Sequence, residues 1–244
     1  MERLDKIIAG TGKYSRREVK ELVRQGRVIV DGRLASSPEE KVDADAACLL
    51  VDGQSLDCRR YTYLMLHKPA GVLSARVDGR QQTVLDLLPP ELRKRDLSPV
   101  GRLDKDTEGL LLLTNDGELA QRLTHPRHHQ PKTYEVLIRG SVPETALAAM
   151  RRGMRLDEGQ ALLPVDVEAK TAENGNTLLR MVLHQGVNRQ IRRMCRDLGL
   201  TILRLRRVAQ GPLALGNLKP GAARALTTGE VADLRQSVGL PSQV

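Results

Sequence analysis

Residues 101–117 have the sequence Gly-Arg-Leu-Asp-Lys-Asp-Thr-Glu-Gly-Leu-Leu-Leu-Leu-Thr-Asn-Asp-Gly. The apolar run Leu110–Leu113 predicts a central strand, because a strand buried on both faces needs apolar side chains at successive positions. Three acids precede it, Asp104, Asp106 and Glu108, in a loop that leads to a sheet edge or cleft, a common place for catalytic side chains. Ordinary surface acids in a turn would give the same charge pattern, and the pattern does not single out one of the three.

Short apolar runs alternate with helix-like patterns over residues 62–240. Further strands are predicted at Tyr63–Leu66, Tyr134–Ile138, Leu178–Leu183 and Ile202–Val208. Helices are predicted at Glu118–Leu123, Pro143–Arg152, Arg189–Leu198 and Gly229–Ser237. This mix predicts an α+β domain over residues 62–240, with a mixed, mainly antiparallel sheet and flanking helices.

The most positive segment, residues 186–207, holds seven arginines and one acid. Its predicted helix has Asn188 as the N-cap and Gly199 just past the end. The apolar face holds Ile191, Met194, Cys195 and Leu198, and the opposite face holds Arg189, Arg192, Arg193 and Arg196. Four arginines on one face indicate recognition of carboxylate or phosphate groups, because a solvated face usually mixes charges.

A basic loop enters the strand predicted at Tyr134. Residues 124–136 have the sequence Thr-His-Pro-Arg-His-His-Gln-Pro-Lys-Thr-Tyr-Glu-Val. A lone tyrosine in a strand is usually a packing residue, and composition assigns Tyr134 no other role. The histidines of this loop and the acids of residues 104–108 lack the spacing of metal ligands, so we expect no metal.

Residues 1–58 predict a small module of two helices and a hairpin. Apolar residues three and four apart predict a first helix at residues 4–8. A capping box of Ser15 and Glu18 begins a second helix, which ends at a glycine. Two strands that each end in an Asp-Gly turn follow, at residues 28–32 and 48–52.

This module is basic on one side. Residues 1–36 carry nine basic and five acidic side chains. Basic residues recur every three or four positions around the second helix, at Lys13, Arg16, Arg17, Lys20 and Arg24. A solvated face can hold such charges, but a basic stripe on so small a module indicates contacts with phosphates. Residues 59–61 are the expected linker to the larger domain.

The composition of the whole chain agrees with a nucleic-acid partner. The 244 residues carry a formal net charge of +9, which favours a polyanion. Four tyrosines are the only aromatic residues, which argues against a broad platform for stacking bases. Three widely spaced cysteines argue against disulfides and zinc and indicate buried or inert thiols. A charged start and short apolar runs predict a cytoplasmic protein that crosses no membrane.

These motifs resemble known families. Arg-Leu-Asp-Lys-Ile-Ile from residue 3, Ser-Arg-Arg-Glu from 15 and Gly-Arg-Val-Ile-Val-Asp-Gly from 26 resemble the S4 RNA-binding domain. Leu-His-Lys-Pro-Ala-Gly at 66–71, the Gly-Arg-Leu-Asp segment, Lys-Thr-Tyr at 132–134 and Asn-Arg-Gln-Ile-Arg-Arg-Met at 188–194 resemble the RsuA-type bacterial ribosomal RNA pseudouridine synthases. The resemblance spans nearly the whole chain, and its Gly-Arg-Leu-Asp-x-Asp-Thr-x-Gly-Leu run is highly specific. Relatives commonly have Phe at the position of Cys195, so we expect the packing around Cys195 to differ from theirs.

The resemblance implies that Asp104 is the catalytic aspartate, Tyr134 the active-site tyrosine and Arg192 the basic residue that pairs with the aspartate. In the implied reaction the N1–C1′ bond of uridine breaks, the uracil turns, and C5 joins C1′ without a cofactor or metal. Arg102 matches an arginine that supports RNA from which the uridine is flipped out. The expected RNA-binding residues are Arg3, Lys6, Arg16, Arg17, Lys20, Arg102, Arg127, His128, Arg189 and Arg193.

The expected partner is ribosomal RNA, bound by a monomer. The Pro-Arg-His-His run at 126–129 is similar to the branch that acts on small-subunit 16S rRNA, and 23S rRNA is the alternative substrate. A non-catalytic S4-type ribosome-assembly factor is the main rival, and it needs no convergence of Asp104, Tyr134 and Arg192. A phosphate-transfer or hydrolytic enzyme is disfavoured, because the sequence has no Gly-rich phosphate loop and no Ser/His/Asp set.

Overall fold

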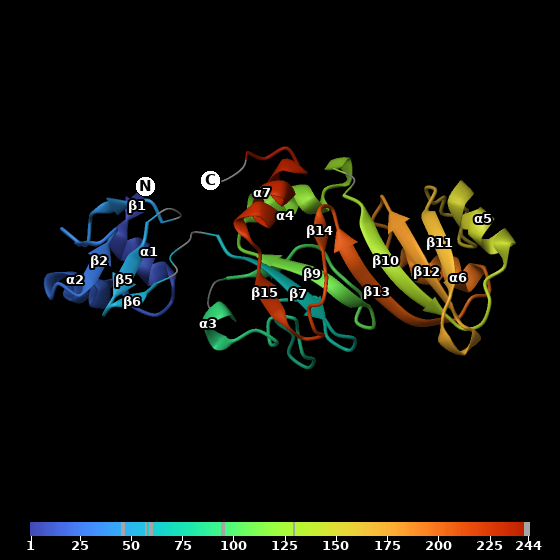
Figure 1. Ribbon diagram of the computed structural model, residues 1–244, viewed down its shortest axis with the longest axis horizontal. Helices are drawn as coiled ribbons and strands as arrows, with labels where there is room; N and C mark the ends of the chain where they lie inside the picture. Colours follow the sequence, from blue (N-terminus) through green and yellow to red (C-terminus); the bar gives the residue numbers. More distant parts are fainter. Residues whose placement is uncertain (45–46, 57, 59–60, 94–95, 129, 242–244) are drawn as a thin grey trace. The chain divides into compact units, whose positions relative to one another are not determined.

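The computed structural model describes residues 1–44, 47–56, 58, 61–93, 96–128 and 130–241 (Figure 1). The chain divides into two compact units, residues 1–62 with 88–97 and residues 63–87 with 98–244. Two residues of the predicted linker, 59 and 60, lie outside the described part of the chain.

The second helix of the smaller unit, Arg16–Arg24, is capped at both ends. The predicted capping box is present: the Glu18 amide donates to Ser15 Oγ (3.3 Å) and the Ser15 amide donates to Glu18 Oε2 (2.7 Å). The helix is closed at Gly26, whose φ of +67° lets two amides donate back to carbonyls of the last turn. The elements are β1 Glu2–Arg3, α1 Leu4–Gly10, α2 Arg16–Arg24, β2 Val28–Val30, β3 Arg33–Leu34, β4 Lys41–Val42, β5 Leu49–Val51, β6 Gln54–Ser55 and α3 Pro90–Arg93.

Both predicted Asp-Gly turns join antiparallel strands in a sheet of order β3-β2-β5-β6. Asp31 and Gly32 have φ values of +49° and +80°, and Asp52 and Gly53 have +54° and +74°. Two consecutive left-handed residues give a tight turn whose twist matches that of a hairpin, and glycine takes the second position without strain. The predicted two helices and hairpin are confirmed.

The larger unit is built on a nine-stranded sheet of order β11-β12-β10-β13-β9-β7-β15, with β14 paired to β13 and β8 to β9 (Figure 1). Its strands are β7 Tyr63–Lys68, β8 Ser98–Pro99, β9 Glu108–Thr114, β10 Lys132–Ile138, β11 Asp166–Thr171, β12 Thr177–Leu183, β13 Ile202–Gln210, β14 Leu213–Ala214 and β15 Ala223–Ala225. Its helices are α4 Gly117–Thr124, η1 Pro126–His128, α5 Glu144–Arg152, η2 Glu173–Gly175, α6 Gln190–Asp197 and α7 Thr228–Gln236. The predicted α+β class with a mixed, mainly antiparallel sheet is confirmed.

One pairing in this sheet is parallel, that of β9 with β13, and we call it the parallel joint. It consists of two residue pairs, Glu108 with Arg206 and Gly109 with Arg207. A Cβ on Gly109 would lie 2.1 Å from the Arg207 carbonyl oxygen, and the φ of Gly109 is +110°, so only glycine fits. The adjoining antiparallel ladders are longer, with six pairs between β7 and β9 and seven between β10 and β13. The two halves of the sheet are therefore linked by their shortest central ladder.

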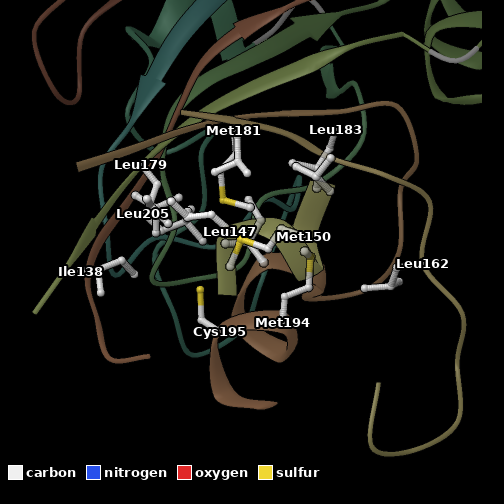
Figure 2. Packing of buried hydrophobic residues seen from close by; sticks show 14 of the residues in the cluster. Ile138, Leu147, Met150, Leu162, Leu179, Met181, Leu183, Met194, Cys195 and Leu205 are labelled. Atoms are coloured by element: carbon white, nitrogen blue, oxygen red, sulfur yellow. The ribbon is translucent and has the colours of Figure 1, made fainter. Parts of the chain in front are cut away.

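Two apolar cores lie in this unit, one in each half of the sheet. The first lies between β10, β12 and β13 and the helices α5 and α6, where Met150, Met181 and Met194 meet (Figure 2). Cys195, where packing was in question, is 1% exposed within this core, and burial raises the pKa of its thiol to about 12. The second core joins β7 and β9 to α4 and α7.

The structure differs from the prediction at the start of α6, and it contains elements that were not predicted. The N-cap of α6 is Arg189, in a left-handed conformation with φ +50° and without a side-chain cap, so Asn188 lies one residue too early to be the cap. β11 was not predicted: it is an edge strand in which Val167 is the only buried residue, and Val167 and Ala169 are its only two apolar residues. Cys48 is exposed, unlike Cys58 and Cys195. Gly199 follows α6 with φ +68°, as predicted. No helix in the described part of the chain is long and apolar enough to span a membrane.

Candidate active site

Residues 103–107, which carry Asp104, form a loop in which five consecutive carbonyls accept hydrogen bonds; we call it the anchored loop. The donors are Ser74 Oγ to Leu103 O (2.9 Å), the Thr107 amide to Asp104 O (3.1 Å), Lys68 Nζ and the Gly71 amide to Lys105 O (both 2.9 Å), Arg192 Nη2 to Asp106 O (3.0 Å) and Lys68 Nζ to Thr107 O (2.9 Å). A backbone fixed at each peptide holds its side chains in one geometry. Asp104 therefore projects from a preorganised support.

Lys68, the last residue of β7, is the main internal support of this loop. Its side chain is fully buried, and Nζ donates to the carbonyls of Pro69, Lys105 and Thr107, each at 2.9 Å. An ammonium group has three donors, so all of them are used. Lys68 thus ties the end of β7 to two carbonyls of the anchored loop.

No role is predicted for Lys68, although it lies in the Leu-His-Lys-Pro run that resembles the pseudouridine synthases. Burial lowers the pKa of Lys68 to about 8, and the negative charges of Asp106, Asp104 and Glu108 oppose this shift. The available signal was a lysine ending an apolar strand, because a lysine buried there must find acceptors for its donors. Ser74 and Gly71 carried no comparable signal.

Two arginines converge on the Asp104 carboxylate. Arg192 Nε lies 3.6 Å and Arg189 Nη1 lies 3.7 Å from Asp104 Oδ2. The Arg192 guanidinium is fixed at its other end, because Nη2 donates to the Asp106 carbonyl (3.0 Å) and to Thr107 Oγ1 (3.2 Å). Arg192 Nε is buried and has no hydrogen-bond partner among the described residues. With 27% of its side chain exposed, Asp104 lies beside two cations and stays open to a reactant.

Tyr134 lies on β10, half-buried, on the sheet face that α6 covers. It is paired with Met181 of β12 and Arg207 of β13, and it packs against the core that contains Ile191 of α6. Arg192 is the next residue of α6, so Tyr134 and the Asp104–Arg192 pair lie on the same side of the sheet. A non-catalytic ribosome-assembly factor would allow Asp104 and Arg192 to lie far apart. In the structure they lie close together.

The four arginines predicted to form one anion-binding face divide into two sets. Arg189 and Arg192 turn to Asp104, whereas Arg193 Nε and Arg196 Nη2 each lie 2.7 Å from the carboxylate of Glu158. Arg193 is 18% exposed. In this structure its guanidinium is therefore engaged by an acid of the same unit, and a role in RNA binding stays a prediction.

Five of the predicted RNA-binding residues lie in the smaller unit, and they differ in how available their charges are. Three are paired with acids: Arg3 with Asp5 (2.8 Å) and Glu39 (3.0 Å), Lys6 with Glu2, and Lys20 with Glu39 (3.9 Å). Arg16 and Arg17 are exposed on α2 and form no ion pair within the described residues. These two present the most available positive charge of the set.

The remaining predicted residues lie near the anchored loop in sequence or in η1. Arg102 and Arg127 are exposed, and His128 is half-buried. His129, the last residue of the Pro-Arg-His-His run, lies outside the described residues. Within the described ranges, no group of three or more His, Cys, Asp or Glu side chains is arranged to hold a metal ion.

Comparison with known proteins identifies the family of this chain. The sequence model of the RNA pseudouridylate synthase family matches residues 62–197, and that of the S4 domain matches residues 2–47. The RNA pseudouridine synthase YtzG of Bacillus subtilis is 43% identical over 230 residues, 94% of this chain and 96% of that protein. Ribosomal large subunit pseudouridine synthase B of Bacillus subtilis is 38% identical, with 96% of each chain covered. A crystal structure of a pseudouridylate synthase is similar with a TM-score of 0.65 at 29% identity, over 96% of this chain and 100% of that one. This chain therefore belongs to the RNA pseudouridine synthase family, as an S4-bearing enzyme of the RsuA type that isomerises uridine in RNA.

Proposed function

We propose that this enzyme isomerises a uridine of ribosomal RNA, with Asp104 as the residue that acts on the sugar. The observation that carries the proposal is the Asp104 carboxylate on the anchored loop, flanked at 3.6 and 3.7 Å by Arg192 and Arg189 and still partly open. A carboxylate that attacks C1′ or removes the 2′ proton must be ionised and correctly oriented. Arg192, Arg189 and the anchored loop fix the orientation of the Asp104 carboxylate.

The reaction balances without an external reactant. The N1–C1′ bond breaks, the C5–C1′ bond forms, the proton on C5 leaves and N1 gains a proton, so substrate and product are isomers. The target uridine must first leave the RNA stack. In this proposal Tyr134 stacks on the flipped uracil and assists removal of the C5 proton, Arg192 orients Asp104, and Arg102 supports the opened RNA.

Two observations bear on which ribosomal RNA is the substrate. The Pro-Arg-His-His run at 126–129 favours 16S rRNA. The likeness to ribosomal large subunit pseudouridine synthase B, at 38% identity over nearly the whole of both chains, favours 23S rRNA. Because the second observation covers both units and the first covers four residues, we propose the large-subunit RNA and keep 16S as the second candidate.

Tritium release tests the reaction. Ribosomal RNA labelled with 5-³H-uridine loses tritium to water only if C5 is attacked, so we expect release with the wild-type enzyme and none with Asp104→Asn. Absence of release from 16S, 23S and their assembly intermediates would leave the S4-type RNA-binding protein as the better description. Mapping pseudouridine in both RNAs from a strain without the gene then identifies the substrate: one site is lost from 23S rRNA under the proposal, or from 16S rRNA under its alternative.

A further inference from the structure

Four charged side chains connect three neighbouring strands of the large sheet, and we call them the ion-pair ladder: Glu108, Arg204, Arg206 and Glu135. Arg204 of β13 donates through Nε (3.0 Å) and Nη2 (2.6 Å) to Glu108 Oε2 of β9. Arg206 of β13 pairs with Glu135 of β10. β13 lies between β9 and β10 in the sheet (Figure 1), so its two arginines hold one acid on either side.

The ladder lies on the face of the sheet opposite to α6. Leu205 of β13 and Val136 of β10 both belong to the core that packs on α6. Side chains alternate between the two faces along a strand. The ladder arginines flank Leu205 and Glu135 precedes Val136, so all three point away from α6, and Tyr134 points toward it. The ladder thus lies behind the candidate active site.

The ladder also spans the parallel joint, whose backbone register comprises two residue pairs. Asp104 lies four residues before Glu108 on the β9 side of the joint, and Tyr134 directly precedes Glu135 on the other side. Glu108 therefore begins the strand that follows Asp104. Glu135 lies on the strand that carries Tyr134. The Glu108–Arg204 pair is the ladder's connection across the joint.

We infer that the ion-pair ladder is a positioning device that sets the placement of Asp104 relative to Tyr134 across the parallel joint. The inference rests on the proposed roles of these two residues and assigns a function to Glu108, one of the two acids of the 104–108 cluster whose side chains the reaction does not use. The ladder acts from the far face of the sheet through the strands. Ion pairs that are partly exposed add little to stability, whereas a misplacement of about 1 Å can lower a rate about a hundredfold.

Substitution of Glu108 separates positioning from stability. We expect Glu108→Gln to lower kcat for tritium release about tenfold, with KM within about twofold and Tm nearly unchanged, because the fold keeps its cores while the joint loses its cross-link. Arg204→Gln should do the same. The double variant should be no slower than either single one, because both remove one interaction.

The matched control is Glu144→Gln, which removes an ion pair of similar length (2.6 Å, with Arg151) on α5, away from the joint. It should leave kcat unchanged. An unchanged kcat in Glu108→Gln would overturn the inference, as would a raised KM alone, which would make the ladder an RNA contact, or a parallel fall of kcat and Tm, which would make it a stabilising contact. Wild-type enzyme without tritium release would instead overturn the proposed function.

Discussion

The cations of the two units differ in where they lie and in what they bind. In the smaller unit they are exposed, and several of them pair with acids, as Arg27 does with Asp52 at 2.6 Å, where both side chains are at least 40% exposed. In the larger unit several are buried, as are Lys68, which donates to three carbonyls, and Arg235, which lies 2.9 Å from the buried Asp116. Cations are thus exposed on the surface of the smaller unit, whereas several in the larger unit are buried and bind acceptors of that unit.

This difference teaches that burial decides what a cation contributes. An exposed pair contributes about 0–1 kcal/mol and leaves its charge available to an RNA phosphate. A buried cation fixes the backbone around it, and removing it costs about 3–5 kcal/mol because charged or polar partners stay behind. We therefore expect the smaller unit to govern affinity and the larger unit to govern rate and stability.

The largest effect is expected for Asp104→Asn, which should lower kcat and leave RNA affinity nearly unchanged. Asp104→Asn keeps the shape of the side chain but removes the charge that we propose acts on the sugar, so kcat should fall by about 10³-fold or more. RNA affinity should stay within about twofold, because the basic residues of the smaller unit are untouched. Single-turnover tritium release and filter binding measure the two quantities. An active Asp104→Asn enzyme would contradict the assignment of this site.

Two matched lysines test the contrast in burial. Lys68→Met removes the ammonium donor from the carbonyls of Pro69, Lys105 and Thr107, and only Lys105 keeps a second donor among the described residues, the Gly71 amide. The free energy of unfolding should therefore fall by about 3 kcal/mol, and kcat should fall with it. Lys6→Met removes an exposed pair with Glu2 and should change stability by less than about 0.5 kcal/mol. Urea denaturation of both variants measures these changes. Equal losses would refute the contrast.

The available charges of α2 should act on affinity alone. Replacing Arg16 and Arg17 by alanine should weaken RNA binding several-fold and reduce the slope of log K against log salt by about 1.4, or about 0.7 for each lost phosphate contact. kcat at saturating RNA should not change. Arg24→Ala is the control, because Arg24 is already paired with Glu21 at 3.1 Å, and it should weaken binding less. A salt slope equal to that of the wild type would place the RNA elsewhere.

The smallest expected effect is a pH dependence above pH 8, where the contribution of Lys68 to stability and kcat change in opposite directions. The pKa of Lys68 is about 8 in the folded protein, against an ordinary value of 10.5. Between these values the unfolded chain holds a proton that the folded one has lost, so the contribution of Lys68 to stability rises with pH. Neutral Lys68 has only two donors for three carbonyls, so kcat should fall modestly above pH 8. An NMR titration that places the pKa of Lys68 near 10.5 would contradict this.

The sequence predicted what local patterns encode. The capping box at Ser15, the Asp-Gly turns and the α+β class follow from short-range rules and are confirmed. The family follows from motifs such as Gly-Arg-Leu-Asp, which the match over residues 62–197 confirms. The roles of Asp104, Tyr134 and Arg192 stay predictions, although the structure places Arg192 3.6 Å from Asp104.

The rest depends on contacts between residues that are distant in sequence. Nothing near Lys68 indicates that its ammonium meets carbonyls some forty positions later, and nothing near Glu158 indicates that it engages Arg193. The helical pattern placed four arginines on one face, but tertiary structure decided which acid each one faces. Arg189, the left-handed N-cap of α6 in place of the predicted Asn188, likewise lies beside an acid that is distant in sequence, Asp104.

The anchored loop has a consequence for the time course of the reaction. Because its five carbonyls are bonded within the protein, we expect RNA binding to cost little conformational entropy in this loop. A catalytic loop that folds around its substrate must wait for that step, whereas this one has no such step. We therefore expect the slow events to belong to the RNA, in the departure of one uridine from its stack and in its return after isomerisation.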